Sequence, residues 1–270
     1  MSTAPLFAVD SIFDFPVGTV LVDDPGGNPP ASGYPKSNAC NWLDGHRWRA
    51  TSSGLAGWKY NFGAATYCNY FAVAGHNLGT GDSIALQVWN GSTFVSVKTF
   101  TNPNLPVLFD TFTLSSGTQW RIQASKSSAP VEIGVIAAGQ YIEIDVPVSI
   151  PFTPPPLAVN PGVMNNVSEA GTMLGRTVGP KIFRTQMRFD LMSEYDWHNL
   201  TKYGKYAQVL YKLWRQPFFL AWCHDSNFDW EAAYAWASAR MRGPSYSHSQ
   251  FLQQALDIEG VCEEANASFN

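Results

Sequence analysis

Charge is scarce in this sequence. Asp, Glu, Lys and Arg make up 14% of the 270 residues, against about a quarter in typical soluble proteins. The formal net charge is -4, and no run of Lys or Arg occurs. Such a run would be the electrostatic footprint of a nucleic-acid-binding protein, so we predict no nucleic-acid partner. Aromatic residues also reach 14%, which predicts a largely uncharged surface of the kind that is buried against partners.

Long apolar runs are missing as well. Residues 1–15 contain no basic segment followed by an apolar stretch, and the longest apolar runs, such as PFFLAW at 217–222, are much too short to cross a bilayer. We therefore predict neither a secretion signal nor a membrane span.

Cysteine is rare, with four residues at positions 40, 68, 223 and 262 and no CxxC spacing. This pattern encodes neither a zinc ribbon nor a local redox pair. Buried free thiols are the simpler interpretation. A Cys40–Cys68 disulfide remains the alternative, although a chain made in reducing cytosol rarely carries one.

Motifs that would specify an enzyme are absent: no P-loop, GxSxG elbow, HExxH, EF-hand loop or dinucleotide fingerprint occurs. The acidic pairs at 23–24 and 263–264 are adjacent, so in an extended chain their side chains point apart. The histidines are never spaced as ligand pairs, and the neighbours in WCHD at 222–225 face opposite ways on a strand. We predict a protein that is not an enzyme, with no catalytic residue, no metal and no cofactor.

Proline marks the clearest boundary. The stretch at 146–162 carries six prolines, which disfavour both helix and central strand and are typical of a semi-rigid linker. We predict a β-sandwich domain at 1–146, a Pro-rich linker at 147–162 and a second domain at 163–270.

The N-terminal half alternates β-branched or aromatic residues with polar ones. This pattern predicts strands within 60–63, 69–78, 83–100, 107–114, 118–125 and 131–144. Several short strands at close spacing indicate a β-sandwich.

The most specific local prediction is a hairpin around Asn90–Gly91, because these residues tolerate the positive φ of a tight turn. The alternation before the turn places Leu86 and Val88 on one face of the strand and Gln87 and Trp89 on the other.

The C-terminal half mixes both periodicities, which predicts an α+β domain with a strongly apolar sheet. Residues 177–193, 216–226 and 250–263 are predicted strands, and 193–214 is a predicted helix. The segment 229–241 reads as a helix by its alanines or as a strand by its alternating aromatics, and composition slightly favours the helix.

Several segments between 31 and 144 occur in the order found in one family. They are Ala31–Ser32, Asn38–Ala39, Asp44–Gly45, Arg47–Arg49, Trp58–Gly63, FAVAGHNL, ALQVWNGSTFVSV, QWRIQAS and VEIGVIAAGQYIEI. This order resembles a galactose-binding-like (discoidin-type) jelly-roll β-sandwich. Many members bind glycans through loops at one end, so the resemblance implies a saccharide role. Only His46 separates Asp44–Gly45 from Arg47–Arg49, too short a loop for the calcium site of the family.

The candidate glycan contacts are His46, Arg47, Trp48, His76 and Asn77, since sugar binding needs aromatic faces beside hydrogen-bonding groups. His46, Arg47 and Trp48 come from NACNWLDGHRWR at 38–49. Two interpretations of this stretch stay open. It is either a core corner, turned by Asp44–Gly45 with Trp48 packed inside, or a ligand pocket, and we favour the corner.

A second resemblance rests on AGHNL together with IFRTQMRFDLMSEYDWHNL and QPFFLAW. These segments look like parts of tail and baseplate proteins of long-tailed bacteriophages. The resemblance implies a structural protein of the virion tail tip that is assembled in the host cytoplasm. It implies a hexameric ring with a hub-type C-terminal domain, and tail tube and tail hub proteins as partners. The alternative function is a carbohydrate-binding module that recognises host-surface glycans.

Overall fold

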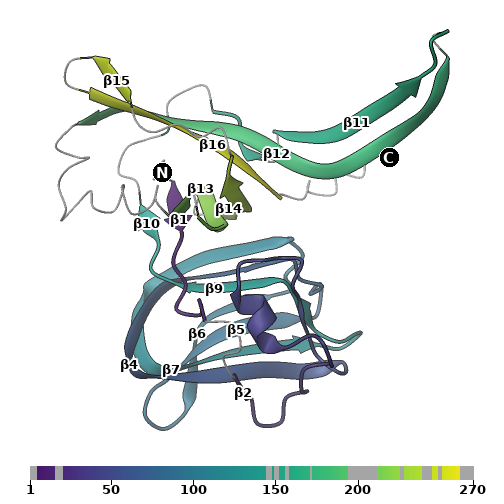
Figure 1. Ribbon diagram of the computed structural model, residues 1–270. Helices are drawn as coiled ribbons and strands as arrows, with labels where there is room; N and C mark the ends of the chain where they lie inside the picture. The colour runs from purple at the N-terminus through teal and green to yellow at the C-terminus, as the bar shows by residue number, and fades with distance from the viewer. Residues whose placement is uncertain are drawn as a thin grey trace.

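The computed structural model describes residues 5–15, 21–143, 148, 152–155, 158–170, 172–193, 212–213, 215–225, 228–238, 245–248 and 251–261, and the structural statements below concern these residues. A β-sandwich formed by the N-terminal half lies against a curved eight-stranded sheet formed mainly by the C-terminal half (Figure 1). The chain is mainly β, as predicted. None of the described segments forms a helix that is long and apolar enough to span a bilayer.

In the described part of the chain the sandwich contains eight strands and one short 3-10 helix. They are β2 (Val22–Asp23), η1 (Lys36–Cys40), β3 (Trp48–Arg49), β4 (Gly54–Ala74), β5 (Ser83–Trp89), β6 (Phe94–Thr101), β7 (Val107–Lys126), β8 (Glu132–Ile133) and β9 (Val135–Gly139). The main sheet has the order β2-β4-β7-β5-β6, with β9 also paired to β4, and β3 pairs with β8. Every pairing of these strands is antiparallel.

Strands β4 and β7 hold the two layers of the sandwich together, because they are paired from Gly54↔Lys126 to Ala74↔Val107. Register shifts between Asn61 and Thr66 interrupt the ladder. Such bulges bend a strand pair. On one side of this bend β7 also pairs with β5, and on the other side β4 also pairs with β9. The first residues of β7 therefore form an edge, next to the end of β6.

The sandwich core is rich in tryptophan. Trp48, Trp58 and Trp120 are fully buried in one cluster with aliphatic residues of both layers. Leu86 and Val88 face this cluster, as the alternation predicted. The hairpin is also confirmed, since β5 and β6 are joined by a turn in which Gly91 has a φ of 102°.

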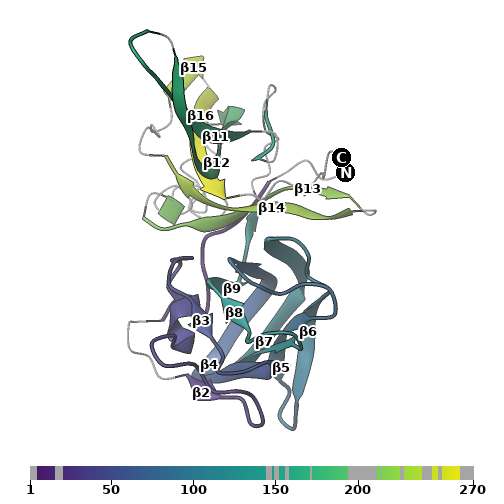
Figure 2. The ribbon, with the colours of Figure 1, turned by 90° about the vertical axis from the view of Figure 1, so that its right-hand side faces the viewer.

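The larger sheet contains β1 (Leu6–Ala8), β10 (Ile142–Glu143), β11 (Val159–Val167), β12 (Met173–Ser193), β13 (Phe218–Asp225), β14 (Phe228–Ala237), β15 (Ser245–His248) and β16 (Phe251–Val261). Its order is β10-β1-β13-β14-β16-β12-β11, with β15 paired to β16. The strands predicted at 177–193, 216–226 and 250–263 are confirmed as β12, β13 and β16. Figure 2 shows β13 and β14 running across the top of the sandwich.

Strand β14 corrects the helix favoured for 229–241. Tyr234 packs in the cluster between the sandwich and the large sheet, whereas Ala233 and Ala235 pack in the cluster on the opposite side of the sheet. A strand that is buried on both faces can place alternate residues in two cores, and this tertiary demand overrides the weak helix preference of alanine.

The predicted helix at 193–214 lies almost wholly outside the described residues. Within it, Lys212 and Leu213 are described and helical. Apart from these two residues, the described part of the C-terminal half consists of strands and their connections, and it does not support the α+β hub assignment.

Both connections to the sandwich are strands of the larger sheet. β1 precedes the sandwich, β10 follows it, and the two pair with each other while β1 also pairs with β13. Within the proline-rich stretch, Val148, Phe152 and Ala158 pack against the C-terminal core, and β11 begins at Val159. The boundaries at 146 and 162 stay a prediction, but Val148, Phe152 and Ala158 of the linker are packed against the core.

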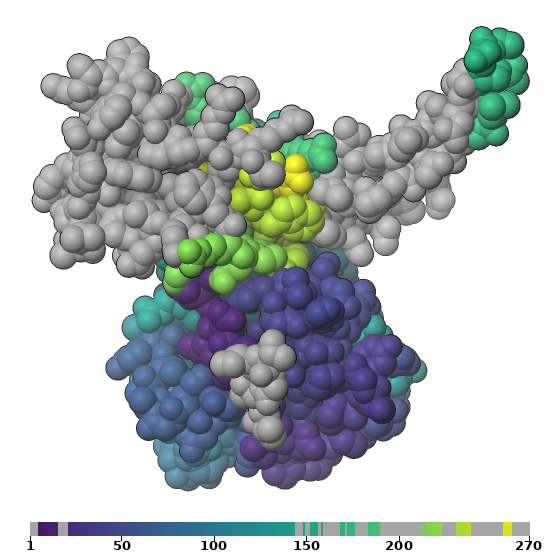
Figure 3. Space-filling model, viewed as in Figure 1, coloured from purple at the N-terminus to yellow at the C-terminus, as the bar shows by residue number. Residues whose placement is uncertain are grey.

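The hairpin of β11 and β12 extends away from the rest of the molecule (Figure 1), and its coloured tip stands clear of the body in the space-filling view (Figure 3). Near this tip Met173 is 58% exposed and Leu174 is 70% exposed. We call β11, β12 and their connecting turn the arm.

Candidate functional site

Trp48 lies in the core corner that the sequence suggested. Its side chain is fully buried, and the ladder pairs Trp48 with Ile133. A ring with no exposed face cannot stack on a sugar, so Trp48 does not fit the predicted role as a glycan contact. NACNWLDGHRWR is thus a structural corner, of which only parts reach the surface.

His76 and Asn77 also serve the structure. Asn77 Nδ2 donates to the carbonyl oxygen of Pro130 at 2.9 Å, and its Oδ1 accepts from the backbone N–H of Glu132 at 3.0 Å. Burial lowers the pKa of His76, although backbone hydrogen bonds to Leu105 and Leu78 partly oppose the shift. A largely buried, neutral His76 and an amide that clamps a neighbouring segment have little left to offer a ligand.

His46 and Arg47 remain exposed. Arg47 Nη1 lies 3.1 Å from Glu132 Oε1, and Asn41 Nδ2 donates to His46 Nδ1 at 3.1 Å. Glu132 links two of the predicted contact residues, because its side chain binds Arg47 while its backbone N–H donates to Asn77. No sequence pattern indicated Glu132, which reaches this place through the β3–β8 ladder.

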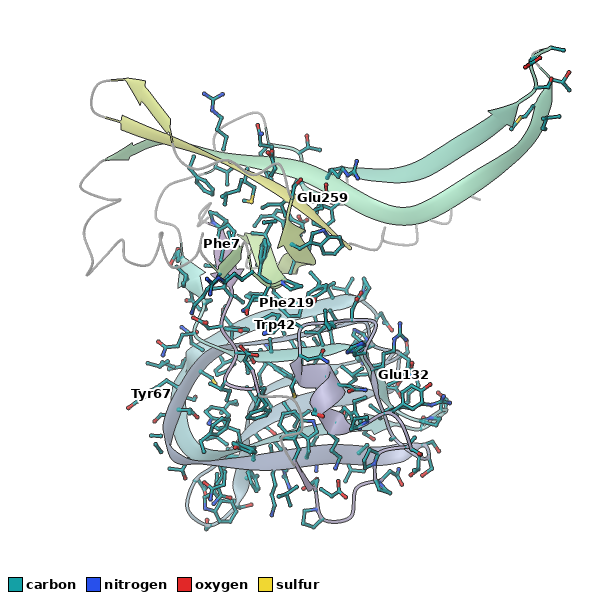
Figure 4. All side chains as sticks on the ribbon, in the orientation of Figure 1. Phe7, Trp42, Tyr67, Glu132, Phe219 and Glu259 are labelled. Carbon is teal, nitrogen blue, oxygen red and sulfur yellow. The ribbon has the colours of Figure 1, made fainter. Side chains whose placement is uncertain are left out.

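We call the surface formed by Tyr34, His46, Arg47, Arg49 and Glu132 the rim. The Arg49 guanidinium lies 6.0 Å from the centroid of the Tyr34 ring, and Tyr34 is 41% exposed. Figure 4 shows Glu132 at the side of the sandwich. The rim has an aromatic face and charged groups, and the Arg47–Glu132 pair partly neutralises it.

A cavity of about 440 Å³ opens where β6 ends and β7 begins, and we call it the loop cavity. It is lined by Lys98, Thr99, Phe100, Thr101, Asn102, Pro103, Asn104, Leu105, Val107, Leu108, Phe109 and Asp110. Its volume lies within the range of about 300–1,000 Å³ that is usual for small-ligand sites.

The polar groups of the loop cavity are held in place by the sandwich. Lys98 forms an ion pair with Asp110, which bridges β6 and β7. Asn102 Oδ1 accepts from the backbone N–H of Gly81 at 2.8 Å, and Asn104 Oδ1 accepts from Thr80 Oγ1 at 3.1 Å. Among the described residues neither amide NH₂ group has a protein acceptor, so both remain available as donors.

Phe100 supplies the aromatic part of the loop cavity. Its ring stacks on Phe71 of the core with centroids 5.4 Å apart and an interplanar angle of 22°, and the Lys98 ammonium lies 5.9 Å from its centroid. An aromatic ring fixed by core packing, with amide, hydroxyl and carboxylate groups around it, matches the chemistry of a carbohydrate site. No sequence pattern pointed to this cavity, although its lining is the continuous stretch from Lys98 to Asp110. Whether this stretch encloses a hollow depends on the core that packs behind it.

A second cavity, of about 520 Å³, lies on the large sheet and is lined by Arg184, Thr185, Gln186, Ser238, Asp257, Ile258 and Glu259. Its polar side chains bind one another. Arg184 Nε lies 3.3 Å from Glu259 Oε1, and Gln186 Nε2 donates to Asp257 Oδ1 at 2.7 Å. Figure 4 places Glu259 on the large sheet, away from the sandwich.

The cysteines and acidic groups offer no reactive centre in the described part of the chain. Cys40 and Cys68 are free, and burial raises the pKa of both thiols. Since the thiolate is the reactive form, both are inert buried thiols. No cluster of three or more His, Cys, Asp or Glu that could hold a metal occurs among the residues described.

No protein-family model matches this chain, and no curated protein matches it. Among solved structures, the chain is similar to chitosan-binding module 1 of a chitosanase/glucanase from Paenibacillus sp. IK-5, with 16% identity, a TM-score of 0.38, and coverage of 45% of this chain and 94% of the module. Module 2 of the same enzyme, in complex with chitotriose, is similar with 13% identity, a TM-score of 0.37, and coverage of 45% of this chain and 95% of the module. A putative alpha-L-fucosidase from Bacteroides thetaiotaomicron is similar with 8% identity, a TM-score of 0.40, and coverage of 48% of this chain and 28% of the fucosidase chain. All three TM-scores lie below 0.5, so these likenesses assign no ligand to this chain.

Proposed function

We propose that the sandwich, as a galactose-binding-like module, binds a carbohydrate in the loop cavity, and that the natural ligand is a host-surface glycan. The observation that carries the proposal is the fixed ring of Phe100 at a cavity that also presents the free amide donors of Asn102 and Asn104. Neither a catalytic residue nor a cofactor is part of the proposal.

The chemistry of the cavity favours a neutral sugar over an ion. Lys98 and Asp110 compensate each other's charge, so the cavity carries no strong net charge that would select an anion or a cation. Sugars present an apolar ring face and several hydroxyl groups, each of which can both donate and accept a hydrogen bond. Phe100 can cover the ring face, while the amides donate to hydroxyl oxygens and Asp110 accepts from a hydroxyl.

Mutations in the loop cavity and in the rim can show which of the two surfaces binds the glycan. The full chain is screened on a glycan array, and the strongest binders are titrated by isothermal calorimetry. Asn104→Ala removes an exposed amide without touching the core, and we expect it to weaken binding about tenfold, the worth of roughly 1.4 kcal/mol. The matched control is Arg47→Ala at the rim, which is expected to leave affinity unchanged.

Two outcomes contradict this assignment. If Arg47→Ala abolishes binding while Asn104→Ala does not, the site is the rim. If the folded protein binds no glycan on the array, the result contradicts the carbohydrate proposal as a whole.

A second function is favoured by the arm. We propose a structural role in which copies of this chain assemble through a repeated head-to-tail contact, as in a hexameric ring at the tail tip of a bacteriophage virion, bound to tail tube and tail hub proteins. The supporting observation is the exposure of Met173 and Leu174 near the tip of a projecting two-stranded ribbon. Such ribbons are only marginally stable alone in water, and exposed apolar groups favour contact with a partner.

Analytical ultracentrifugation tests this second function. We expect the wild type to sediment as a closed oligomer, and the double variant Met173→Asp, Leu174→Asp to sediment as a monomer. The control is Leu114→Asp on the sandwich, where the native side chain is similarly exposed at 54%. A monomeric wild type at high concentration argues against self-assembly.

A further inference from the structure

One wall of the loop cavity is shared with the joint between the sandwich and the large sheet. Val107, Leu108 and Phe109 at the start of β7 all line the cavity. Leu108 packs inward in the sandwich core, whereas Val107 and Phe109 pack in the cluster that fills the joint. The position of this wall therefore depends on what lies behind it.

The large sheet supplies the other half of that cluster. Phe219 of β13 and Tyr234 of β14 belong to it, and their rings lie 5.4 Å apart. Phe219 is fully buried, and β14 lies against β7. The first residues of β7 pair with β4 on one side and form an edge on the other, so packing against the large sheet is what fixes this edge from behind.

The joint is also latched by a specific contact. Tyr234 donates its hydroxyl to the backbone oxygen of Trp42. Trp42 has a φ of 59°, and its ring lies 6.1 Å from that of Phe219. Figure 4 shows Trp42 and Phe219 together at the boundary between the sandwich and the large sheet. A bulky residue keeps a left-handed conformation only where the surrounding structure enforces it, so this joint is a single fixed packing arrangement.

We propose that the large sheet sets the shape of the loop cavity, and that Phe219 is the positioning residue that supports the cavity wall through Val107 and Phe109. Phe219 touches no ligand in this scheme. The effect on affinity rests on the proposed carbohydrate function, whereas the effect on the wall itself does not.

The chain offers a matched pair of variants in adjacent residues. Phe218 and Phe219 are both fully buried on β13, but Phe218 faces the opposite cluster, where it packs 6.0 Å from Phe7. Phe219→Leu and Phe218→Leu remove the same atoms from the same strand. Both full-length variants are compared by hydrogen exchange of peptides covering 105–111, and by calorimetric titration with lactose and with chitotriose.

We expect both variants to lower the midpoint of thermal unfolding to a similar extent. Only Phe219→Leu is expected to speed exchange in 105–111, by about tenfold, and to weaken the affinity for whichever of the two sugars the wild type binds. Equal exchange in the two variants overturns the proposal.

Two further results keep the test decisive. If Phe219→Leu does not fold, Tyr234→Phe, which removes only the latch hydroxyl, takes its place. Unchanged exchange in 105–111 of that variant overturns the proposal in the same way. If the wild type binds neither lactose nor chitotriose, the glycan array decides the carbohydrate function, and the exchange data still decide whether the large sheet controls the cavity wall.

Discussion

Lys36 gives the sharpest test of the energetics, because it combines a buried amine with a weak partner. Its side chain is 3% exposed at the start of η1, and its ion-pair partner Asp23 has a side chain that is 56% exposed. Burial lowers the pKa of Lys36 from 10.5 to about 8. Between these two values the unfolded chain binds a proton that the folded chain does not, so the free energy of unfolding must rise with pH through this interval.

The size of the effect follows from the same values. Each pKa unit is worth about 1.36 kcal/mol, so a shift from 10.5 to about 8 corresponds to at most about 3 kcal/mol. The ion pair with Asp23 offsets part of this penalty by up to about 1 kcal/mol, the usual worth of a pair with a solvated partner. At pH 7 we therefore expect Lys36→Met to be more stable than the wild type by about 2 kcal/mol.

A comparison of the two proteins is needed because Cys40 and Cys68 act in the opposite direction. Burial raises the pKa of both thiols, so above about pH 9 they ionise only in the unfolded chain, and stability falls. Both proteins carry these cysteines, so the effect cancels in the difference. The advantage of Lys36→Met should shrink steadily from pH 8 and vanish at about pH 9.5, because about 2 kcal/mol is the worth of about one and a half pKa units.

The assay is urea unfolding followed by tryptophan fluorescence at several pH values between 7 and 10.5. Lys59→Met, which replaces a half-buried lysine of β4, is the control for the exchange of Lys for Met itself. A stability difference between Lys36→Met and the wild type that stays constant within about 0.5 kcal/mol over this range refutes the reasoning.

Three further predictions concern the core. A Cβ at Gly57 would lie 2.4 Å from a backbone oxygen of β7, so Gly57→Ala should cost about 3 kcal/mol or more in urea unfolding, whereas Gly45→Ala, with open space around it, should stay within about 0.5 kcal/mol. Burial raises the pKa of Asp82, but its 2.8 Å contact with Lys126 and its backbone hydrogen bonds outweigh burial and lower the pKa overall. Stability supplied by Asp82 should thus be lost as pH falls below about 4, and Asp82→Asn, expected to cost about 3–5 kcal/mol at pH 7, should flatten the acid limb of a fluorescence titration. Trp48→Ala should lower stability by about 3–5 kcal/mol in thermal unfolding followed by circular dichroism, and an equally stable variant would contradict its place in the core.

The strands that the sequence predicted well are those whose pattern is local. The alternation around Leu86 and Val88 needs only the period of a strand, and the turn at Asn90–Gly91 needs only residues that accept positive φ. The same holds for β12, β13 and β16. For β14 the local signals conflict, and burial on both faces decided for a strand.

The candidate site shows the opposite behaviour. Trp42 and Trp48 are the same residue type and lie close in sequence. Trp48 nevertheless packs in the sandwich core, while Trp42 lies in the joint against the large sheet. Lys98 and Asp110 form an ion pair beside the loop cavity only because the end of β6 lies next to the start of β7 in the fold. Glu132 reaches Arg47 through a ladder that no local pattern encodes.

By itself the sequence determined that this chain is mainly β, because alternation and turn chemistry are properties of neighbouring residues. It also favoured the corner at Asp44–Gly45 over a ligand pocket, and the burial of Trp48 decided for the corner. Only the tertiary structure decided which surface can take a ligand. The rim and the joint combine residues that are distant along the chain, and the loop cavity, although residues 98–110 line it, is backed by the sandwich core and by the joint. Burial and strand register bring those residues together, and both are properties of the whole fold.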